Sequence, residues 1–296
     1  MATPHLVQYQ GSKRNIASEI SSYFPKRINR LIEPFCGTAA VSILAAKQNK
    51  VGKFILNDIN KPLVEMLELC VKQPEVLYRQ YEEIWNGQFV EGTNNIDYFY
   101  KMREKFNQES EPALMLFMLA RVVKGAVRYN NNGQMNQSCD KRRNGTRPEL
   151  IRNNAIQISN LLNNRTEFYN LDYREMLLKA QPGDLVYMDP PYQGTSNTSD
   201  NRYYQGVDYE ELVNALKLLN DKNVDFIISY DGMTGEKKHG KDLPDYLELT
   251  HIFINSGKSA QSTLLGKKEI TYESLYLSKN LKCVYENRAE QLKLII

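Results

Sequence analysis

The stretch that decides the fold is Leu31-Ile32-Glu33-Pro34-Phe35-Cys36-Gly37-Thr38-Ala39, which continues into an alanine-rich run ending at Lys47. A short apolar run that stops at a glycine and leads into good helix formers predicts a strand, a sharp turn and a helix. Gly37 allows the backbone to turn sharply and to approach a ligand closely. The fold prediction rests on the recurrence of this strand-turn-helix pattern along the chain.

Strands and helices alternate outward from this stretch. Residues 15–23 predict a short helix, 53–58 a second strand and 61–71 a further helix. The alternation resumes later with strands and helices predicted over 167–171, 173–179, 184–188, 209–220 and 225–229. Such alternation is typical of a parallel sheet with crossover helices. The last two strand-like runs, 246–254 and 273–278, have no long helix between them, so we expect an antiparallel end to a mixed sheet.

The alternation of strands and helices is interrupted between residues 74 and 150. This part has helical patterns, such as residues 112–123, and a polar stretch rich in asparagine and arginine, but it has no clear βαβ unit. We therefore expect one α/β domain formed by residues 1–73 and 151–296. A mostly helical insertion, residues 74–150, interrupts it.

Composition excludes several classes of protein. The chain has 296 residues, of which 42% are hydrophobic and 25% charged, as in an ordinary globular protein. Its four cysteines are scattered and it has only three histidines, so neither a disulfide framework nor a structural zinc site is expected. No apolar run approaches the ~20 residues that span a bilayer. We expect a cytoplasmic protein that neither enters a membrane nor uses a metal.

Asp189-Pro190-Pro191-Tyr192 directly follows the predicted strand 184–188. In an open α/β sheet, ligands bind beyond the carboxyl ends of the strands, which is where this tetrapeptide falls. The two prolines fix the backbone and remove two amide donors. A carboxylate, free carbonyls and an aromatic ring suit an amino group on a flat base, and the ring of Tyr192 can stack on that base. The polar segment 193–206 is predicted to be either a loop that closes over the site or an ordinary exposed connection.

Asp58 ends the second predicted strand, 21 positions after Gly37. Acidic residues at about this spacing reach ribose hydroxyls in nucleotide-binding α/β folds. A dinucleotide site is the obvious alternative, but Ala39 stands where its second glycine would be. Asp172, after the strand 167–171, is either a second residue near a cofactor or a helix N-cap.

Together these elements resemble the Dam-like, alpha-order adenine-specific DNA methyltransferases of restriction-modification systems. That family has an aromatic-x-Gly-x-Lys element, then Glu-Pro-Phe-x-Gly, Asp-Ile-Asn, a target-recognition insertion and Asp-Pro-Pro-Tyr. The corresponding stretches occur here in the same order, as Tyr9 to Lys13, Glu33 to Gly37, Asp58 to Asn60 and Asp189 to Tyr192. Two departures are Ala39 in place of a second glycine and Tyr9 in place of a frequent tryptophan.

The resemblance implies a Rossmann-like methyltransferase fold that uses S-adenosylmethionine and no metal to methylate the exocyclic amino group of adenine in duplex DNA. It assigns catalysis to Asp189, Pro190 and Tyr192, after the adenine has been flipped out of the helix. Combined with the residues discussed above, it gives a set of expected cofactor-binding residues: Tyr9, Lys13, Phe35, Gly37, Asp58, Asp172 and Asp189. We expect a monomer that acts separately from any cognate restriction endonuclease.

Positive charge is concentrated in a strip around the end of the insertion. Between Arg121 and Arg152 there are eight basic and two acidic residues, a net charge of +6 against +3 for the whole chain. Such a strip is typical of phosphate binding. Within it, residues 128–136 predict a β-hairpin with an Asn-Gly turn, similar to the hairpin that Dam-like enzymes insert into DNA. We expect bases to be contacted by Arg128, Asn130, Gln134 and Asn136. Phosphates would be contacted by Lys141, Arg142, Arg143 and Arg147.

Three other functions compete with this interpretation. An RNA or protein methyltransferase could use a similar tetrapeptide, although the hairpin and the order of the elements favour DNA. A catalytically inactive DNA-binding protein is disfavoured by the intact Asp189 and Tyr192. A nucleotide-dependent oxidoreductase is disfavoured because the glycine fingerprint of dinucleotide sites is missing.

Overall fold

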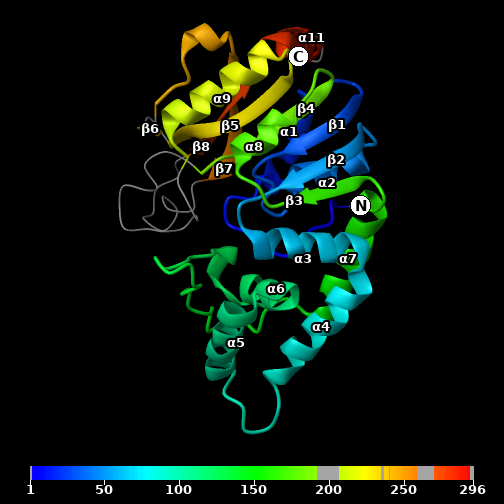
Figure 1. Ribbon diagram of the computed structural model, residues 1–296, viewed down its shortest axis with the longest axis vertical. Coiled ribbons are helices and arrows are strands. Elements are labelled where there is room, and N and C mark those ends of the chain that lie inside the picture. The colour runs from blue at the N-terminus through cyan, green and yellow to red at the C-terminus, as the bar shows by residue number, and fades with distance from the viewer. Residues whose placement is uncertain (1, 192–206, 235–236, 240, 259–269, 294–296) are drawn as a thin grey trace.

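The computed structural model describes residues 2–191, 207–234, 237–239, 241–258 and 270–293. Within these ranges the centre of the protein is a sheet with the strand order β3-β2-β1-β4-β5-β8-β7, and a short β6 pairs with β5 (Figure 1). The strands are β1 (Ile28–Glu33), β2 (Val51–Asn57), β3 (Thr166–Tyr169), β4 (Asp184–Met188), β5 (Asp225–Thr234), β6 (Lys237–His239), β7 (Thr250–Lys258) and β8 (Ile270–Leu277).

The direction of the strands confirms the predicted mixed sheet. Strands β3, β2, β1, β4 and β5 are mutually parallel, whereas β8 runs antiparallel to both β5 and β7. From β1 the chain proceeds to β2 and β3 on one side, and β4 then begins the other half of the sheet. The strand order therefore reverses between β1 and β4, and ligands of open α/β sheets bind beside such a switch point.

Helices cover both faces of the sheet because the apolar side chains of each strand alternate in direction. Leu31 and Leu185 belong to one hydrophobic core, and their chain neighbours Ile32 and Val186 belong to the other. The first core includes side chains of α1 (Ala17–Ser21), α2 (Ala40–Lys47), α3 (Lys61–Lys72) and α7 (Pro148–Leu162). The second includes side chains of α8 (Tyr173–Leu178) and α9 (Tyr209–Asp221).

The insertion is mostly helical, as predicted. Its helices are α4 (Pro74–Gly87), α5 (Asn95–Glu109) and α6 (Pro112–Arg121), which form the lobe beyond α3 and α7 in Figure 1. The helix α6 packs against α3, α4 and α5, and the side chains of residues 113–119 are all buried. Because these side chains join the same core as β1, the insertion is packed firmly against the sheet domain.

Several elements differ from the prediction. The helix expected over 15–23 is split into the 3-10 turn Lys13–Asn15 and α1, and residues 245–247 form a 3-10 turn before β7 begins at Thr250. Two helices were not predicted, α7 and α11 (Lys282–Lys293). The start of α7 has a detectable signal, since Pro148 occupies its first turn and buried residues recur every three or four positions.

A helix that spans a bilayer needs about 20 mostly apolar residues. None of the described helices is both long enough and apolar enough to do so.

Candidate active site

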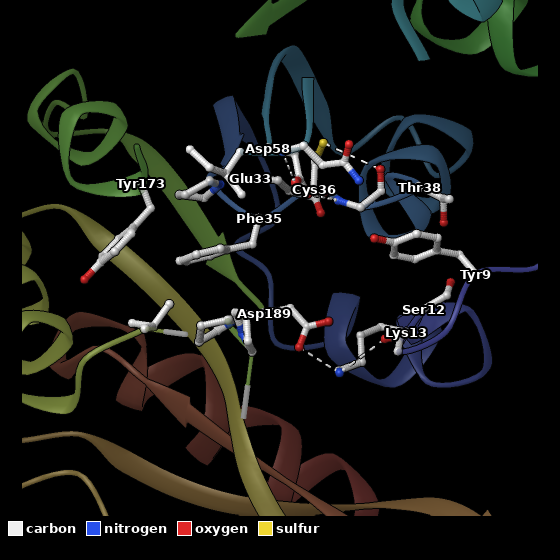
Figure 2. Close-up of a pocket in the computed structure, with 18 of the residues that line it drawn as sticks. Tyr9, Ser12, Lys13, Glu33, Phe35, Cys36, Thr38, Asp58, Tyr173 and Asp189 are labelled. Atoms are coloured by element: carbon white, nitrogen blue, oxygen red, sulfur yellow. Dashed lines mark hydrogen bonds and ion pairs between the residues drawn. The ribbon is translucent and has the colours of Figure 1, made fainter. Parts of the chain in front are cut away.

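A cavity of about 220 Å³ opens at the carboxyl ends of β1 to β4. Figure 2 shows side chains converging on it from the ends of β1, β2 and β4 and from the N-terminal segment. Its lining includes every described residue that the sequence assigned to cofactor binding or catalysis: Tyr9, Lys13, Phe35, Gly37, Asp58, Asp172, Asp189 and Pro190. Tyr192 and the predicted closing loop, residues 193–206, lie outside the described residues.

The turn between β1 and α2 forms one wall. Gly37 has φ +50°, as expected for a sharp turn at a glycine, and a Cβ there would lie 3.3 Å from Cε1 of Tyr9. The Tyr9 ring therefore packs directly over the glycine. Ala39, at the N-cap of α2, also has a left-handed backbone with φ 54°. A left-handed alanine costs roughly 1–2 kcal/mol, so the alanine in place of a second glycine is accommodated at the expense of backbone strain.

Asp58 holds this turn in place. Its carboxylate accepts hydrogen bonds from the backbone N–H of Gly37 at 3.0 Å and of Asn60 at 2.9 Å. Burial raises the pKa of Asp58, while these two hydrogen bonds act in the opposite direction. A carboxylate has about four acceptor positions, so two backbone donors leave room for a ligand hydroxyl.

Asp172 fulfils the helix-capping alternative and also lines the cavity. It is the N-cap of α8, where it accepts a hydrogen bond from the backbone N–H of Arg174 at 2.9 Å. The Arg174 guanidinium binds the same carboxylate with Nε at 2.8 Å and lowers its pKa. Asp172 therefore stays ionised at the cavity wall. The ring of Phe35, which also lines the cavity, packs on Tyr173 with centroids 5.1 Å apart.

Lys13 and Asp189 meet at the floor of the cavity. Lys13 Nζ lies 2.7 Å from Asp189 Oδ1 and 2.9 Å from Glu273 Oε1 of β8. Burial raises the pKa of Asp189 to about 6, with Lys13 opposing this shift and Glu273 adding to it. Glu273 was missed from the sequence because nothing about an isolated glutamate in a C-terminal strand marks it for this site.

Glu33 is a second buried carboxyl of the site, and its role was also missed. It ends β1, is 2% exposed, and accepts a hydrogen bond from the backbone N–H of Ser42 at 2.8 Å. It thereby satisfies one of the free donors in the first turn of α2. Burial is the main cause that raises the pKa of Glu33 to about 8. The carboxyl therefore binds its proton more tightly in the folded protein than in the unfolded chain.

This shift predicts how Glu33 affects stability. Because the folded pKa lies near 8 and the ordinary value is 4.5, the wild type should lose stability as pH rises between them. Glu33→Gln keeps an acceptor for Ser42 but cannot ionise. Urea unfolding measures the free energy of unfolding of both proteins at about pH 5 and about pH 8.5. The free energy of Glu33→Gln relative to the wild type should be higher at about pH 8.5 than at about pH 5, by about a few kcal/mol. Equal pH dependence in the two proteins would contradict the expectation. The control is Glu68→Gln, because Glu68 is a half-buried residue of α3 that pairs with Lys72 outside the site.

The insertion contributes to the cavity wall, which the sequence did not indicate. Val127 and Tyr129 line the cavity, and the Tyr129 hydroxyl donates to Asn60 Oδ1 at 3.3 Å. The N-terminal segment is joined to the same part of the insertion by a hydrogen bond from Gln10 N–H to the Gly125 carbonyl at 3.2 Å. The N-terminal segment, which the sequence assigned to cofactor binding, and the insertion, which it assigned to DNA recognition, therefore form one wall of the cavity.

The predicted hairpin is present as a short turn with one antiparallel bridge, between Tyr129 and Met135. Gly133 has φ +72°, in agreement with the predicted Asn-Gly turn. Three of its proposed base-contacting residues, Arg128, Gln134 and Asn136, are exposed. The fourth, Asn130, bonds within the turn, because its Oδ1 accepts from the backbone N–H of Gln134 at 2.9 Å and its Nδ2 donates to the Gln134 side chain.

The basic strip is exposed along most of its length. All four residues proposed to contact phosphates are exposed: Lys141, Arg142, Arg143 and Arg147. Arg142 and Arg143 share Asp140, with nitrogen-oxygen distances of 3.0 and 3.7 Å. Arg121 is an exception to the strip, since it is 1% exposed and donates to the carbonyls of Arg143 and Asn95. The buried guanidinium of Arg121 therefore holds the loop by hydrogen bonds, and its charge does not belong to the exposed basic surface.

Metal ligands do not gather in the part of the chain that the structure describes. Among those residues there is no group of three or more His, Cys, Asp or Glu side chains that could hold a metal ion.

Comparison with known proteins identifies the family. A model of D12 class N6 adenine-specific DNA methyltransferases matches residues 9–259. A type II methyltransferase, M1.LlaDCHI of Lactococcus lactis subsp. cremoris, is 29% identical over 75% of this chain and 79% of its own length. DNA adenine methylases are 29% identical in Serratia marcescens (67% of this chain, 70% of the relative) and 26% identical in Escherichia coli K12 (67% and 68%). By this match over residues 9–259, the chain belongs to the D12 class of N6 adenine-specific DNA methyltransferases.

Proposed function

We propose that the cavity binds S-adenosylmethionine through Tyr9, Lys13, Phe35, Gly37, Asp58, Asp172 and Asp189, and that the target adenine enters beside Asp189 and Pro190. The observation that carries this proposal is the meeting of Lys13 and Asp189 at the carboxyl end of β4, beside the switch point. Membership of the methyltransferase family supplies the identity of the methyl donor.

The chemistry of the lining fits this cofactor. The ribose hydroxyls of S-adenosylmethionine need hydrogen-bond acceptors, which Asp58 and Asp172 offer. The flat purine of the cofactor fits against the exposed part of the Phe35 ring. Because Gly37 has no side chain and Tyr9 packs tightly over it, the turn presents backbone and an aromatic ring to the cofactor. Its positively charged sulfonium is compatible with a cavity that holds several carboxylates. When bound, the cofactor supplies an electrophilic methyl group.

The residues of the chain prepare the amino group of adenine to receive this methyl group. That nitrogen is a poor nucleophile because its lone pair is delocalised into the ring. The Asp189 carboxylate and the Pro190 carbonyl each accept a hydrogen bond from one N–H group of the amine. These two hydrogen bonds draw the nitrogen towards tetrahedral geometry, which frees the lone pair. Asp189 must be ionised to do so, and Lys13 at 2.7 Å favours the ionised form. Tyr192 is proposed to stack on the base.

The adenine amine is buried in duplex DNA, so the base must first be flipped out at a cost of a few kcal/mol. We propose that residues 74–150 are the target-recognition part and that residues 1–73 and 151–296 form the catalytic part. Arg128, Asn130, Gln134 and Asn136 are the proposed base-contacting or gap-filling residues. Exposure supports this role for three of them, whereas the bonds of Asn130 within the turn favour a role in shaping the hairpin.

Substitution of Arg128 and Arg147 separates base reading from phosphate binding. With labelled S-adenosylmethionine, wild type should label adenine in duplex DNA. On duplexes that differ by one base pair, Arg128→Ala should lose about 5- to 150-fold of the discrimination at one position, because a bidentate base contact contributes roughly 1–3 kcal/mol. Arg147→Ala should weaken binding to all duplexes and reduce the salt slope of affinity by about one.

The matched control is Arg152→Ala, since Arg152 is already paired with Glu75 at 2.7 Å. It should change neither discrimination nor the salt slope by a comparable amount. If Arg128→Ala keeps the full sequence preference of the wild type, Arg128 does not read a base.

We further propose that the enzyme acts as a monomer and protects DNA against a separate cognate endonuclease. One relative, of Streptococcus sanguinis, is named modification methylase StsI, which supports a restriction-modification context. Sedimentation of the complex with a single-site duplex would measure the number of chains bound.

A further inference from the structure

The floor of the active site contains a lysine shared by two carboxylates. Lys13 comes from the 3-10 turn before α1, Asp189 from the end of β4, and Glu273 from the middle of β8. Lys13 Nζ lies 2.7 Å from Asp189 Oδ1 and 2.9 Å from Glu273 Oε1. The side chains are 10%, 20% and 11% exposed for Lys13, Asp189 and Glu273. At this burial, breaking the set by removing one charge has a large effect on the others.

The backbone brings Glu273 close to the site. Glu273 lies opposite Gly232 of β5, beyond a register shift between Ser229 and Gly232. A Cβ at Gly232 would lie 2.2 Å from the Tyr272 carbonyl oxygen, so only a glycine allows β8 to approach β5 this closely. The position of the Glu273 carboxylate beside Lys13 is therefore fixed by the sheet. Glu273 also lies beyond residue 259, where the match to the family model ends.

The charge balance explains what Glu273 can do. With one lysine between two carboxylates, neither carboxylate is fully neutralised. If Asp189 alone paired with Lys13, the ammonium would direct its charge at the oxygens that must accept the amine hydrogen. A second carboxylate draws part of that charge away and leaves Asp189 a stronger acceptor.

We propose that Glu273 is a positioning residue for methyl transfer, which holds Lys13 in a shared position so that Asp189 keeps its acceptor strength towards the adenine amine. This inference rests on the role proposed above for Asp189. Among the described residues, the other titratable groups that face Asp189 are Tyr187 on its own strand and Glu33 of β1. Their pKa values are both raised, by burial first and by the charge of Asp189 among the further causes, so both are protonated at neutral pH.

Glu273→Gln tests the proposal. The control is Glu68→Gln, which removes a half-buried carboxyl of α3 that pairs with Lys72. Glu273→Gln should lower kcat about tenfold and leave the KM for duplex DNA within about twofold, because the affected contact forms with the reacting amine. Burial is the main cause that raises the pKa of Asp189 to about 6, and the charge of Glu273 contributes to this rise. The acid limb of the pH profile of kcat should therefore move to lower pH in Glu273→Gln. Glu273→Asp, which restores the charge, should return the limb towards the wild-type position.

A double-substitution cycle with Lys13→Met tests whether Glu273 acts through Lys13. Once Lys13 is replaced, Glu273→Gln should have little further effect on kcat, since coupled residues are not additive. Thermal unfolding checks that each variant retains its fold, and calorimetric binding of S-adenosylhomocysteine checks the cofactor site of the variants that keep Lys13. Wild-type kcat and pH profile in Glu273→Gln, or full additivity in the cycle, would overturn the proposal. If instead Asp189→Ala retains activity, this result contradicts the acceptor role proposed above for Asp189.

Discussion

Replacing Asp189 with alanine is expected to slow methyl transfer to adenine about 1,000-fold, the largest loss expected from any single substitution in the site. The substitution removes the carboxylate that is proposed to accept a hydrogen bond from the amine, and it leaves Glu273 to pair with Lys13 without Asp189. Label transferred from S-adenosylmethionine to duplex DNA, followed by nucleoside analysis, measures the loss. Duplex binding should change little, because the proposed base-reading and phosphate-binding residues lie on the insertion.

Two further variants define the cause of this loss. Asp189→Asn keeps one acceptor oxygen and should fall between alanine and wild type. Asp221→Ala, at the exposed end of α9, should be as active as the wild type. A rate near that of the wild type in Asp189→Ala would exclude the proposed acceptor role and leave the backbone carbonyls of the motif as the acceptors.

Gly125→Ala is expected to weaken cofactor binding at least about tenfold, although Gly125 does not itself line the cavity. Gly125 has φ +62°, and a Cβ there would lie 1.9 Å from the carbonyl oxygen of Gln8 and 2.9 Å from Cα of Tyr9. Both neighbours are backbone atoms, so the N-terminal segment would have to move. Because Tyr9 and Lys13 line the cavity from this segment, the displacement should reach the cofactor site. Calorimetric binding of S-adenosylhomocysteine measures the effect.

Gly92→Ala is the matched control, because Gly92 also has a left-handed backbone, with φ +78°, but nothing lies within 4 Å of the added Cβ. It should cost only the strain of a left-handed alanine, roughly 1–2 kcal/mol, and leave cofactor affinity unchanged. An unchanged affinity in Gly125→Ala would show that the N-terminal segment can shift without disturbing the site.

The strand-turn-helix stretch at residues 31–47 predicted the fold correctly because its signals are local. An apolar run, a glycine and a helix-forming run each act over a few residues, and β1, Gly37 and α2 follow them closely. The tetrapeptide that begins at Asp189 was predicted to lie at the carboxyl end of a strand, and β4 ends at Met188. The order of strands along the chain also indicated the antiparallel end, because no long helix is predicted between the runs that correspond to β7 and β8.

The packing of the insertion could not be predicted in this way. The burial of Arg121 depends on carbonyl groups of residues 95 and 143, which only the folded chain brings together. From its sequence Arg121 is one more positive charge in a basic strip. The contribution of Tyr129 to the cavity wall likewise depends on Asn60, 69 positions away in the chain.

The fold class, the family and the carboxylates at the strand ends were predicted from the amino-acid sequence, because they depend on periodicity and on motifs in a fixed order. Only the folded structure shows that Glu273 shares Lys13 with Asp189, that Glu33 is buried under the first turn of α2, and that the insertion lines the cavity at the strand ends. Charges alter one another's pKa values only when folding brings them within a few ångströms in a place that excludes water, and no local pattern in the chain encodes that distance.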